Sequence, residues 1–120
     1  MSTVMILEDN NAKIENILTK NDCFNQSTVL IVRSCAMAKQ LLLTMPTKER
    51  FVLYVDYELF PGCGSGFEFL EWVLPALKGR IDEVVITSMS GSWKHEMANL
   101  CKLADVKFSE LSLSKLFVIN

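Results

Sequence analysis

The sequence predicts an α/β fold in which one doubly wound, five-stranded parallel sheet lies between two layers of helices. Two observations support this prediction. Apolar, β-branched segments alternate five times with segments of helical character along the 120 residues, as in a chain of βα units. The apolar segments are also nearly continuous, which is typical of strands that are buried on both faces of a parallel sheet.

Strands are expected where apolar and β-branched residues cluster. The first such segment is TVMILED and the third is RFVLYVD, and both end in acidic residues. The expected strands cover residues 3–9, 27–34, 50–56, 83–88 and 105–109.

Helices are expected between these strands, at residues 12–20, 35–45, 66–74 and 92–104, followed by a short last helix within 110–120. Asn10 and Asn11 suit the N-terminal cap of the first helix, and Ser92 that of the fourth. Proline interrupts a helix, so Pro46 is expected to stop the second helix and Pro75 to end or kink the third. No linker or repeat breaks this order, and we expect one domain over residues 1–120.

The composition argues against several classes of function. The net charge is −2 and the pI about 5.4, so no basic surface points to nucleic acid or to an anionic membrane. No apolar run reaches the roughly 20 residues of a membrane helix, and Glu8 and Asp9 interrupt any signal-peptide pattern. We therefore expect a cytoplasmic protein. The four cysteines form no C-x-x-C pair and predict reduced thiols, not a zinc site.

Carboxylates stand at the ends of two expected strands, with Glu8 and Asp9 after the first and Asp56 after the third. Neighbouring parallel strands end at the same edge of a sheet, so these carboxylates are expected to share one site. Like charges held that close need a proton or a cation, and Mg²⁺ suits a site with few protein ligands. A carboxylate beside magnesium can accept a phosphoryl group. The alternative is that these acids are solvated loop residues or helix caps.

The fourth expected strand ends in Thr87 and Ser88. A hydroxyl at this edge of the sheet would lie beside the acidic cluster and could bond a phosphoryl oxygen. Thr and Ser are common at strand ends, so this observation gains its weight from its position.

Together these segments resemble the receiver domain of two-component response regulators, a CheY-like family with a flavodoxin-like fold. The matching segments are ILEDN, VLYVD with its Pro/Gly turn, GFEFL, VVITS and LADVKF, in the family's order over nearly the whole chain. The resemblance implies that Asp56 is the phosphoacceptor and that Thr87 is the switch hydroxyl. It also implies a Mg²⁺ site formed by Glu8, Asp9, Asp56 and the main-chain carbonyl of Glu58.

The resemblance implies partners as well. Receivers take the phosphoryl group from a histidine kinase or a phosphotransfer protein, and water later removes it. A downstream protein would bind the face formed by helix four, strand five and helix five. The apolar residues of 110–120, with Trp93, could belong to the core, to this partner surface or to a homodimer contact. His95 falls on the expected fourth helix, away from the site, and is not expected to be the donor.

The loop after the acceptor departs from the family pattern. Receivers usually carry proline four residues and glycine eight residues after the acceptor, whereas here Pro61 follows Asp56 by five residues and Gly66 follows it by ten. The sequence therefore predicts about two extra residues in the glycine-rich loop 59–66.

The end of the fifth strand departs further. The family's lysine, whose ammonium contacts the phosphoryl oxygens, falls on Glu110, and Leu111 replaces the proline that follows it. A glutamate would add repulsion where attraction is required. Lys107 could substitute for that lysine if the fifth strand is shortened, with Phe108 as the displaced aromatic residue. Otherwise Lys107 is an exposed lysine of an edge strand.

Three functions remain open from the sequence. The first is a stand-alone response-regulator receiver of a two-component phosphorelay, without an output domain, which signals by binding a partner. The second is a pseudo-receiver, an interaction module independent of phosphorylation, which Glu110 and the longer loop favour. The third is a small magnesium-dependent phosphatase-like enzyme, in which Glu58 would be the second acid, but no substrate-binding cap is present. We expect the first: a phosphoacceptor capable of autodephosphorylation, not an enzyme.

Overall fold

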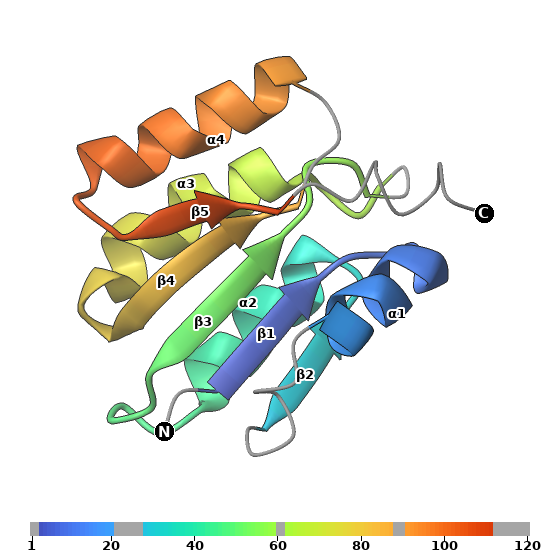
Figure 1. The fold of residues 1–120 in the computed structure, drawn as a ribbon. Helices are drawn as coiled ribbons and strands as arrows, with labels where there is room; N and C mark the ends of the chain where they lie inside the picture. Colours follow the sequence, from blue (N-terminus) through green and yellow to red (C-terminus); the bar gives the residue numbers. More distant parts are fainter. Residues whose placement is uncertain (1–2, 21–27, 60–61, 88–90, 112–120) are drawn as a thin grey trace.

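The structure, a computed structural model, describes residues 3–20, 28–59, 62–87 and 91–111. Five parallel strands form one sheet with the strand order β2-β1-β3-β4-β5 (Figure 1). The strands are β1 (Thr3–Leu7), β2 (Val29–Val32), β3 (Phe51–Val55), β4 (Ile81–Ile86) and β5 (Phe108–Glu110). The predicted five-stranded parallel sheet is confirmed.

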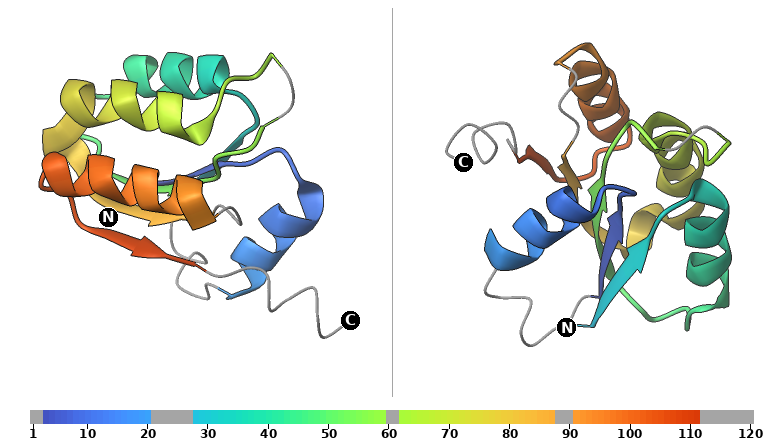
Figure 2. Two further views of the ribbon diagram at one scale, coloured as in Figure 1. Left: turned by 90° about the horizontal axis from the view of Figure 1, so that it is seen from above. Right: turned by 90° about the vertical axis from the view of Figure 1, so that its right-hand side faces the viewer.

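Four helices connect the strands within the described ranges, and their bounds are α1 (Asn11–Lys20), α2 (Cys35–Thr44), α3 (Gly66–Leu77) and α4 (Gly91–Leu103). Helices α2, α3 and α4 lie on one face of the sheet and α1 on the other (Figure 2). The chain passes from β1 outward to β2 and then returns to the opposite side of β1 to form β3. This reversal of strand order creates the crevice at the carboxyl ends of β1 and β3 in which doubly wound folds bind ligands.

The core follows the alternation of side chains along each strand. On the face covered by α2, α3 and α4, the buried strand residues are Met5, Leu7, Val32, Phe51, Leu53, Val55, Ile81, Val84 and Ile86. On the opposite face the buried strand residues are Val4, Ile6, Tyr54 and Val85, which cluster with Ile17 of α1. The sheet is thus buried on both faces, as the continuous apolar strands predicted.

Strand β4 begins earlier, and strand β5 later, than predicted. Strand β4 starts at Ile81, which pairs with Phe51, and a register shift then accommodates Asp82 before Glu83 pairs with Val52. Strand β5 starts only at Phe108, because Asp105 and Val106 terminate α4. Asp105 adopts φ 57° and its N–H donates to the carbonyl of Lys102 at 3.1 Å. This left-handed residue closes the helix and leaves the strand shorter than 105–109.

Two helix boundaries also differ from the prediction. Helix α3 continues through Pro75 to Leu77, and since Pro75 and Glu71 are both exposed, water can reach the Glu71 carbonyl that lacks its usual donor. Helix α4 begins at Gly91, which makes Ser92 its second residue and not its cap. The predicted cap of α1 is confirmed, since Asn10 Oδ1 accepts from the N–H of Lys13 at 3.1 Å.

The expected last helix lies almost wholly outside the described residues: Glu110 ends β5, and the description stops at residue 111. Within the described part of the chain, no helix is long and apolar enough to cross a membrane.

Candidate functional site

Three polar residues immediately follow the carboxyl ends of β1, β3 and β4: Glu8, Asp56 and Thr87. Their N–H groups still donate across the sheet, at 3.0 Å to Val32, 3.2 Å to Leu7 and 3.0 Å to Val55. The ladder therefore extends one residue beyond the named strands. As a result, the three residues lie side by side at one edge of the sheet.

The side chains of Glu8, Asp56 and Thr87 are almost completely buried, with exposures of 0%, 1% and 1%. Each residue lies two positions after a buried residue of the α1-covered face, namely Ile6, Tyr54 and Val85. Strand alternation therefore directs all three side chains toward the side of the sheet on which α1 packs.

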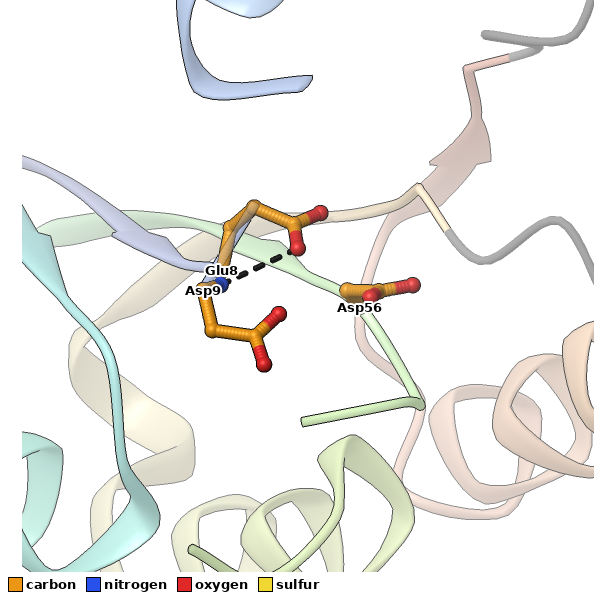
Figure 3. A group of neighbouring side chains, drawn as sticks. All are labelled: Glu8, Asp9 and Asp56. Atoms are coloured by element: carbon orange, nitrogen blue, oxygen red, sulfur yellow. Dashed lines mark hydrogen bonds between the residues drawn. The ribbon is translucent and has the colours of Figure 1, made fainter. Parts of the chain in front are cut away.

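Asp9 completes an acidic cluster with Glu8 and Asp56. One carboxylate oxygen from each residue lies within 4.8 Å of the others, and the three carboxyl groups converge (Figure 3). Glu8 Oε2 accepts from the N–H groups of Asp9 at 3.0 Å and Asn10 at 3.2 Å. The turn after β1 thereby fixes one carboxylate oxygen of Glu8, and the other has no hydrogen-bond partner.

Four buried oxygen atoms of the site have no hydrogen-bond partner: Glu8 Oε1, both carboxylate oxygens of Asp56 and Thr87 Oγ1. A buried polar atom without a partner costs free energy, and native proteins rarely keep several together unless a ligand satisfies them. Hard oxygen donors in this number and spacing fit a divalent cation such as Mg²⁺. The remaining oxygens fit hydrogen-bond donors or charges on a bound group.

The ammonium of Lys13 lies 3.5 Å from Asp56 Oδ2, and its side chain is only 13% exposed. Sequence reasoning missed this residue, because it considered only the ends of the strands. A signal was available, since Lys13 stands in the first turn of the helix that directly follows Glu8 and Asp9. Helical side chains tilt toward the helix N-terminus, which here is the acidic edge of the sheet.

Burial shifts the ionisation of the two innermost acids. It raises the pKa of Glu8 to about 8, with the charge of Asp56 adding to the effect and the charge of Lys13 opposing it. Burial also raises the pKa of Asp56, while the ion pair with Lys13 acts in the opposite direction. The protein alone therefore does not supply enough positive charge to keep both carboxylates ionised at neutral pH.

Backbone contacts join the two ends of the loop between β3 and α3. Glu58 and Ser65 form an isolated antiparallel bridge, and the N–H of Gly66 donates to the carbonyl of Tyr57 at 3.0 Å. Gly66 packs directly on the backbone of Asp56, because a Cβ there would lie 2.0 Å from the Asp56 carbonyl oxygen. These contacts join the two ends of the loop in which the sequence predicts about two extra residues, and residues 60–61 of that loop lie outside the described ranges. The Glu58 side chain is exposed, so only its backbone belongs to the site.

The remaining candidates are not members of the acidic cluster. Lys107 is 76% exposed, and its ammonium lies 4.0 Å from Glu83. Its carbonyl accepts from the N–H of Val84, so Lys107 lies beside the middle of β4 and not at the carboxyl end of that strand. Glu110 pairs with Ile86 and so stands near Thr87 at the correct edge, with its side chain exposed. His95 is exposed on α4. The suggested substitution by Lys107 is therefore not supported by its position.

Response regulators and their receiver domains are among the solved structures that share this architecture. The phosphorylated cyanobacterial phytochrome response regulator RcpA is 23% identical, covers 98% of this chain and 87% of its own, and has a TM-score of 0.70. A CheY-like receiver domain from Methanospirillum hungatei JF-1 is 15% identical, with coverages of 99% and 90% and a TM-score of 0.63. The response regulator MaeR bound to beryllium trifluoride is 18% identical, with coverages of 83% and 77% and a TM-score of 0.63.

The chain therefore has the fold of CheY-like response-regulator receiver domains. No protein-family model matches the sequence. No curated protein matches it either. At identities of 15–23% the likeness is one of fold, so the function has to be argued from the residues of the site.

Proposed function

We propose that this chain is a response-regulator receiver that accepts a phosphoryl group on Asp56. The observation that carries the proposal is the alignment of Glu8, Asp56 and Thr87 on adjacent strand ends, with four buried oxygens that lack a hydrogen-bond partner. The fold is compatible with this chemistry, since RcpA is described as phosphorylated and MaeR as bound to beryllium trifluoride.

The transfer would proceed by direct displacement at phosphorus. A carboxylate oxygen of Asp56 attacks the phosphorus of a phosphohistidine on a histidine kinase or phosphotransfer protein, and a P–O bond forms as the P–N bond breaks. The imidazole nitrogen keeps the electron pair of the broken bond and takes a proton from water. The Thr87 hydroxyl is placed to donate to a phosphoryl oxygen, since its Oγ1 is buried beside Asp56 without another partner.

Release of the phosphoryl group would need only water. A water oxygen attacks phosphorus, the P–O bond to Asp56 breaks, and its electron pair returns to the carboxylate. The proton of the attacking water leaves with phosphate or to solvent. We describe the chain as a phosphoacceptor with this slow autodephosphorylation and not as an enzyme that acts on a separate substrate.

Glu8, Asp9, Asp56 and the main-chain carbonyl of Glu58 would hold Mg²⁺. When bound, the ion would neutralise charge on the transferring phosphoryl oxygens. The residues themselves contribute rigidity: Glu8 is fixed by two backbone N–H groups, and Asp56 by the strand ladder. Of the carboxylates, Asp9 is the half-buried one and is therefore the most accessible to an entering ion.

The output would be a change in partner binding on the face formed by α4 and β5. Helix α4 is the next element along the chain after β4, and Thr87 directly follows β4, so we expect movement of this hydroxyl to alter the start of that helix. We propose a downstream protein as the partner of this face, and neither nucleic acid nor a membrane.

A pseudo-receiver is the second candidate function. The observation that favours it is Glu110, which stands near Thr87 where a positive charge would be expected. In such a protein the same α4–β5 face would bind its partner without phosphorylation.

One experiment separates the two candidates. The protein is incubated with MgCl₂ and either acetyl phosphate or beryllium trifluoride, and is followed by intact mass and by ¹H–¹⁵N NMR. We expect a phosphate adduct in the wild type that is absent from Asp56→Asn and Asp56→Ala. Asp105→Asn is the matched control, because Asp105 is exposed and asparagine tolerates its φ of 57°. Absence of both the adduct and the beryllium trifluoride response in the wild type would leave the pseudo-receiver.

A further inference from the structure

The internal ion pair between Lys13 and Asp56 is the most unusual feature of the acidic cluster. The Lys13 ammonium lies 3.5 Å from Asp56 Oδ2, and its side chain is 13% exposed. Lysine is rarely buried unless it is paired, because removing an ammonium from water is costly. The Asp56 carboxylate, which is itself only 1% exposed, offsets that cost by pairing with the ammonium.

The local structure directs Lys13 into the site. Asn10 caps α1 by accepting from the N–H of Lys13, which places this residue in the first turn of the helix. The side chain then points back toward the helix N-terminus and reaches the carboxyl ends of β1 and β3. Arg33 stabilises the turn between β1 and α1, since its guanidinium donates to the Asp9 carbonyl at 3.1 Å and to Asn11 Oδ1 at 2.7 Å.

In the ranges that the structure describes, Lys13 is the one basic residue that forms an ion pair with these carboxylates. Lys107 pairs with Glu83 away from the site, and Arg50 pairs with Asp82 near the opposite ends of the strands. At the end of β5 the residue is Glu110, which carries the wrong charge for a phosphoryl group. Among the described residues, the positive charge that pairs with Asp56 therefore comes from α1.

We propose that Lys13 binds the phosphoryl group on Asp56 and is the stabilising cation that the protein itself supplies. This inference rests on the proposed function. Phosphorylation turns one Asp56 oxygen into the bridging atom of the acyl phosphate and moves negative charge outward onto the phosphoryl oxygens. The Lys13 ammonium lies within reach of them, because its flexible four-carbon side chain already ends beside Asp56 Oδ2. Charge-assisted contacts of this kind are among the strongest in proteins.

The proposal is tested by the dissociation constant of beryllium trifluoride, measured in MgCl₂ by NMR titration. We expect Lys13→Met to weaken binding about tenfold or more, as loss of a hydrogen bond to a charged group does. Lys13→Arg keeps the charge and should lose less. Lys107→Met is the matched control and should bind as the wild type does, because Lys107 is exposed beside Glu83.

Equal binding by the wild type and Lys13→Met would overturn the proposal while leaving the receiver function intact. Failure of the wild type to bind at all would instead reject the proposed function, and the inference with it.

The wild type gives a second measurement that is independent of whether the variants fold. The ¹³Cε resonance of Lys13 should shift on saturation with beryllium trifluoride while that of Lys107 does not, and an unshifted Lys13 resonance would refute the contact.

Discussion

The indole of Trp93 stacks on the ring of Tyr57, with ring centroids 4.0 Å apart and an angle of 10° between the planes. Tyr57 directly follows the proposed acceptor Asp56, and Trp93 stands in the first turn of α4. Phe67 of α3 lies against the same indole, at a centroid distance of 5.6 Å. Trp93 therefore joins the acceptor loop to α4. The sequence had allowed it a place in an apolar surface with residues 110–120, most of which lie outside the described ranges.

This stack predicts an optical signal for events at Asp56. The chain has two tryptophans, so Trp72→Phe leaves Trp93 as the single emitter. Addition of beryllium trifluoride with MgCl₂ should change its fluorescence intensity in a saturable way, because any shift of the acceptor loop alters the stacking with Tyr57. The same titration of Trp72→Phe/Asp56→Asn should be flat. An adduct seen by mass together with constant emission would show that the stack is uncoupled from the site.

The sequence predicted the elements whose signals are local. Continuous apolar strands and the helical segments between them gave the parallel sheet, and the rule that neighbouring parallel strands end together brought Glu8, Asp9 and Asp56 to one place. These inferences need only periodicity and chain order. They do not need the angle at which any helix crosses the sheet.

The features that the sequence did not predict depend on packing or on an unusual backbone angle. Lys13 reaches Asp56 because α1 packs on the face of the sheet. Its place in the first turn after Glu8 and Asp9 indicates this contact only once that packing is known. The end of α4 uses Asp105 at φ 57°, where a glycine would have been the usual signal. Pro75 failed to end α3 because both it and Glu71 face solvent.

The buried Glu8 predicts that stability without a divalent cation falls as the pH rises. Its pKa is raised from 4.5 to about 8, so between these values the folded protein binds a proton that the unfolded chain does not. The free energy of unfolding should then decrease with pH, with a slope of up to about 1.4 kcal/mol per unit. Asp56 contributes in the same direction, since burial raises its pKa, while the Lys13 ammonium opposes both.

Urea unfolding in EDTA between pH 5 and about 8 measures this slope. Glu8→Gln should flatten it, because glutamine can keep the hydrogen bonds from Asp9 and Asn10 without titrating. The exposed Glu15→Gln on α1 is the control and should leave the slope unchanged. Saturating MgCl₂ should reverse the dependence in the wild type, since the ion requires the ionised carboxylates. A wild-type slope that matches Glu8→Gln would contradict the assignment.

Asp9 and Glu58 should respond differently to removal of their carboxylates. Asp9 would bind Mg²⁺ through its side chain, which belongs to the three-carboxylate cluster. Glu58 would use only its backbone carbonyl, and its side chain is exposed. Asp9→Asn should therefore weaken Mg²⁺ binding by at least about tenfold, whereas Glu58→Ala should stay within about twofold. Calorimetric titration with MgCl₂ distinguishes them, and a comparable loss in both variants would exclude the backbone role of Glu58.

Gly66 should tolerate no side chain, because a Cβ there would lie 2.0 Å from the Asp56 carbonyl oxygen and 2.8 Å from Val55 Cγ1. Both neighbours belong to the end of β3, so Gly66→Ala must displace α3 or the acceptor itself. We expect the free energy of unfolding to fall by about 3 kcal/mol, together with weaker binding of beryllium trifluoride.

Gly79→Ala is the matched control, since nothing lies within 4 Å of the position that its methyl group would take. Its stability should change by no more than about 0.5 kcal/mol. If denaturant unfolding shows equal stabilities for the two variants, α3 does not press on the acceptor as tightly as these distances require.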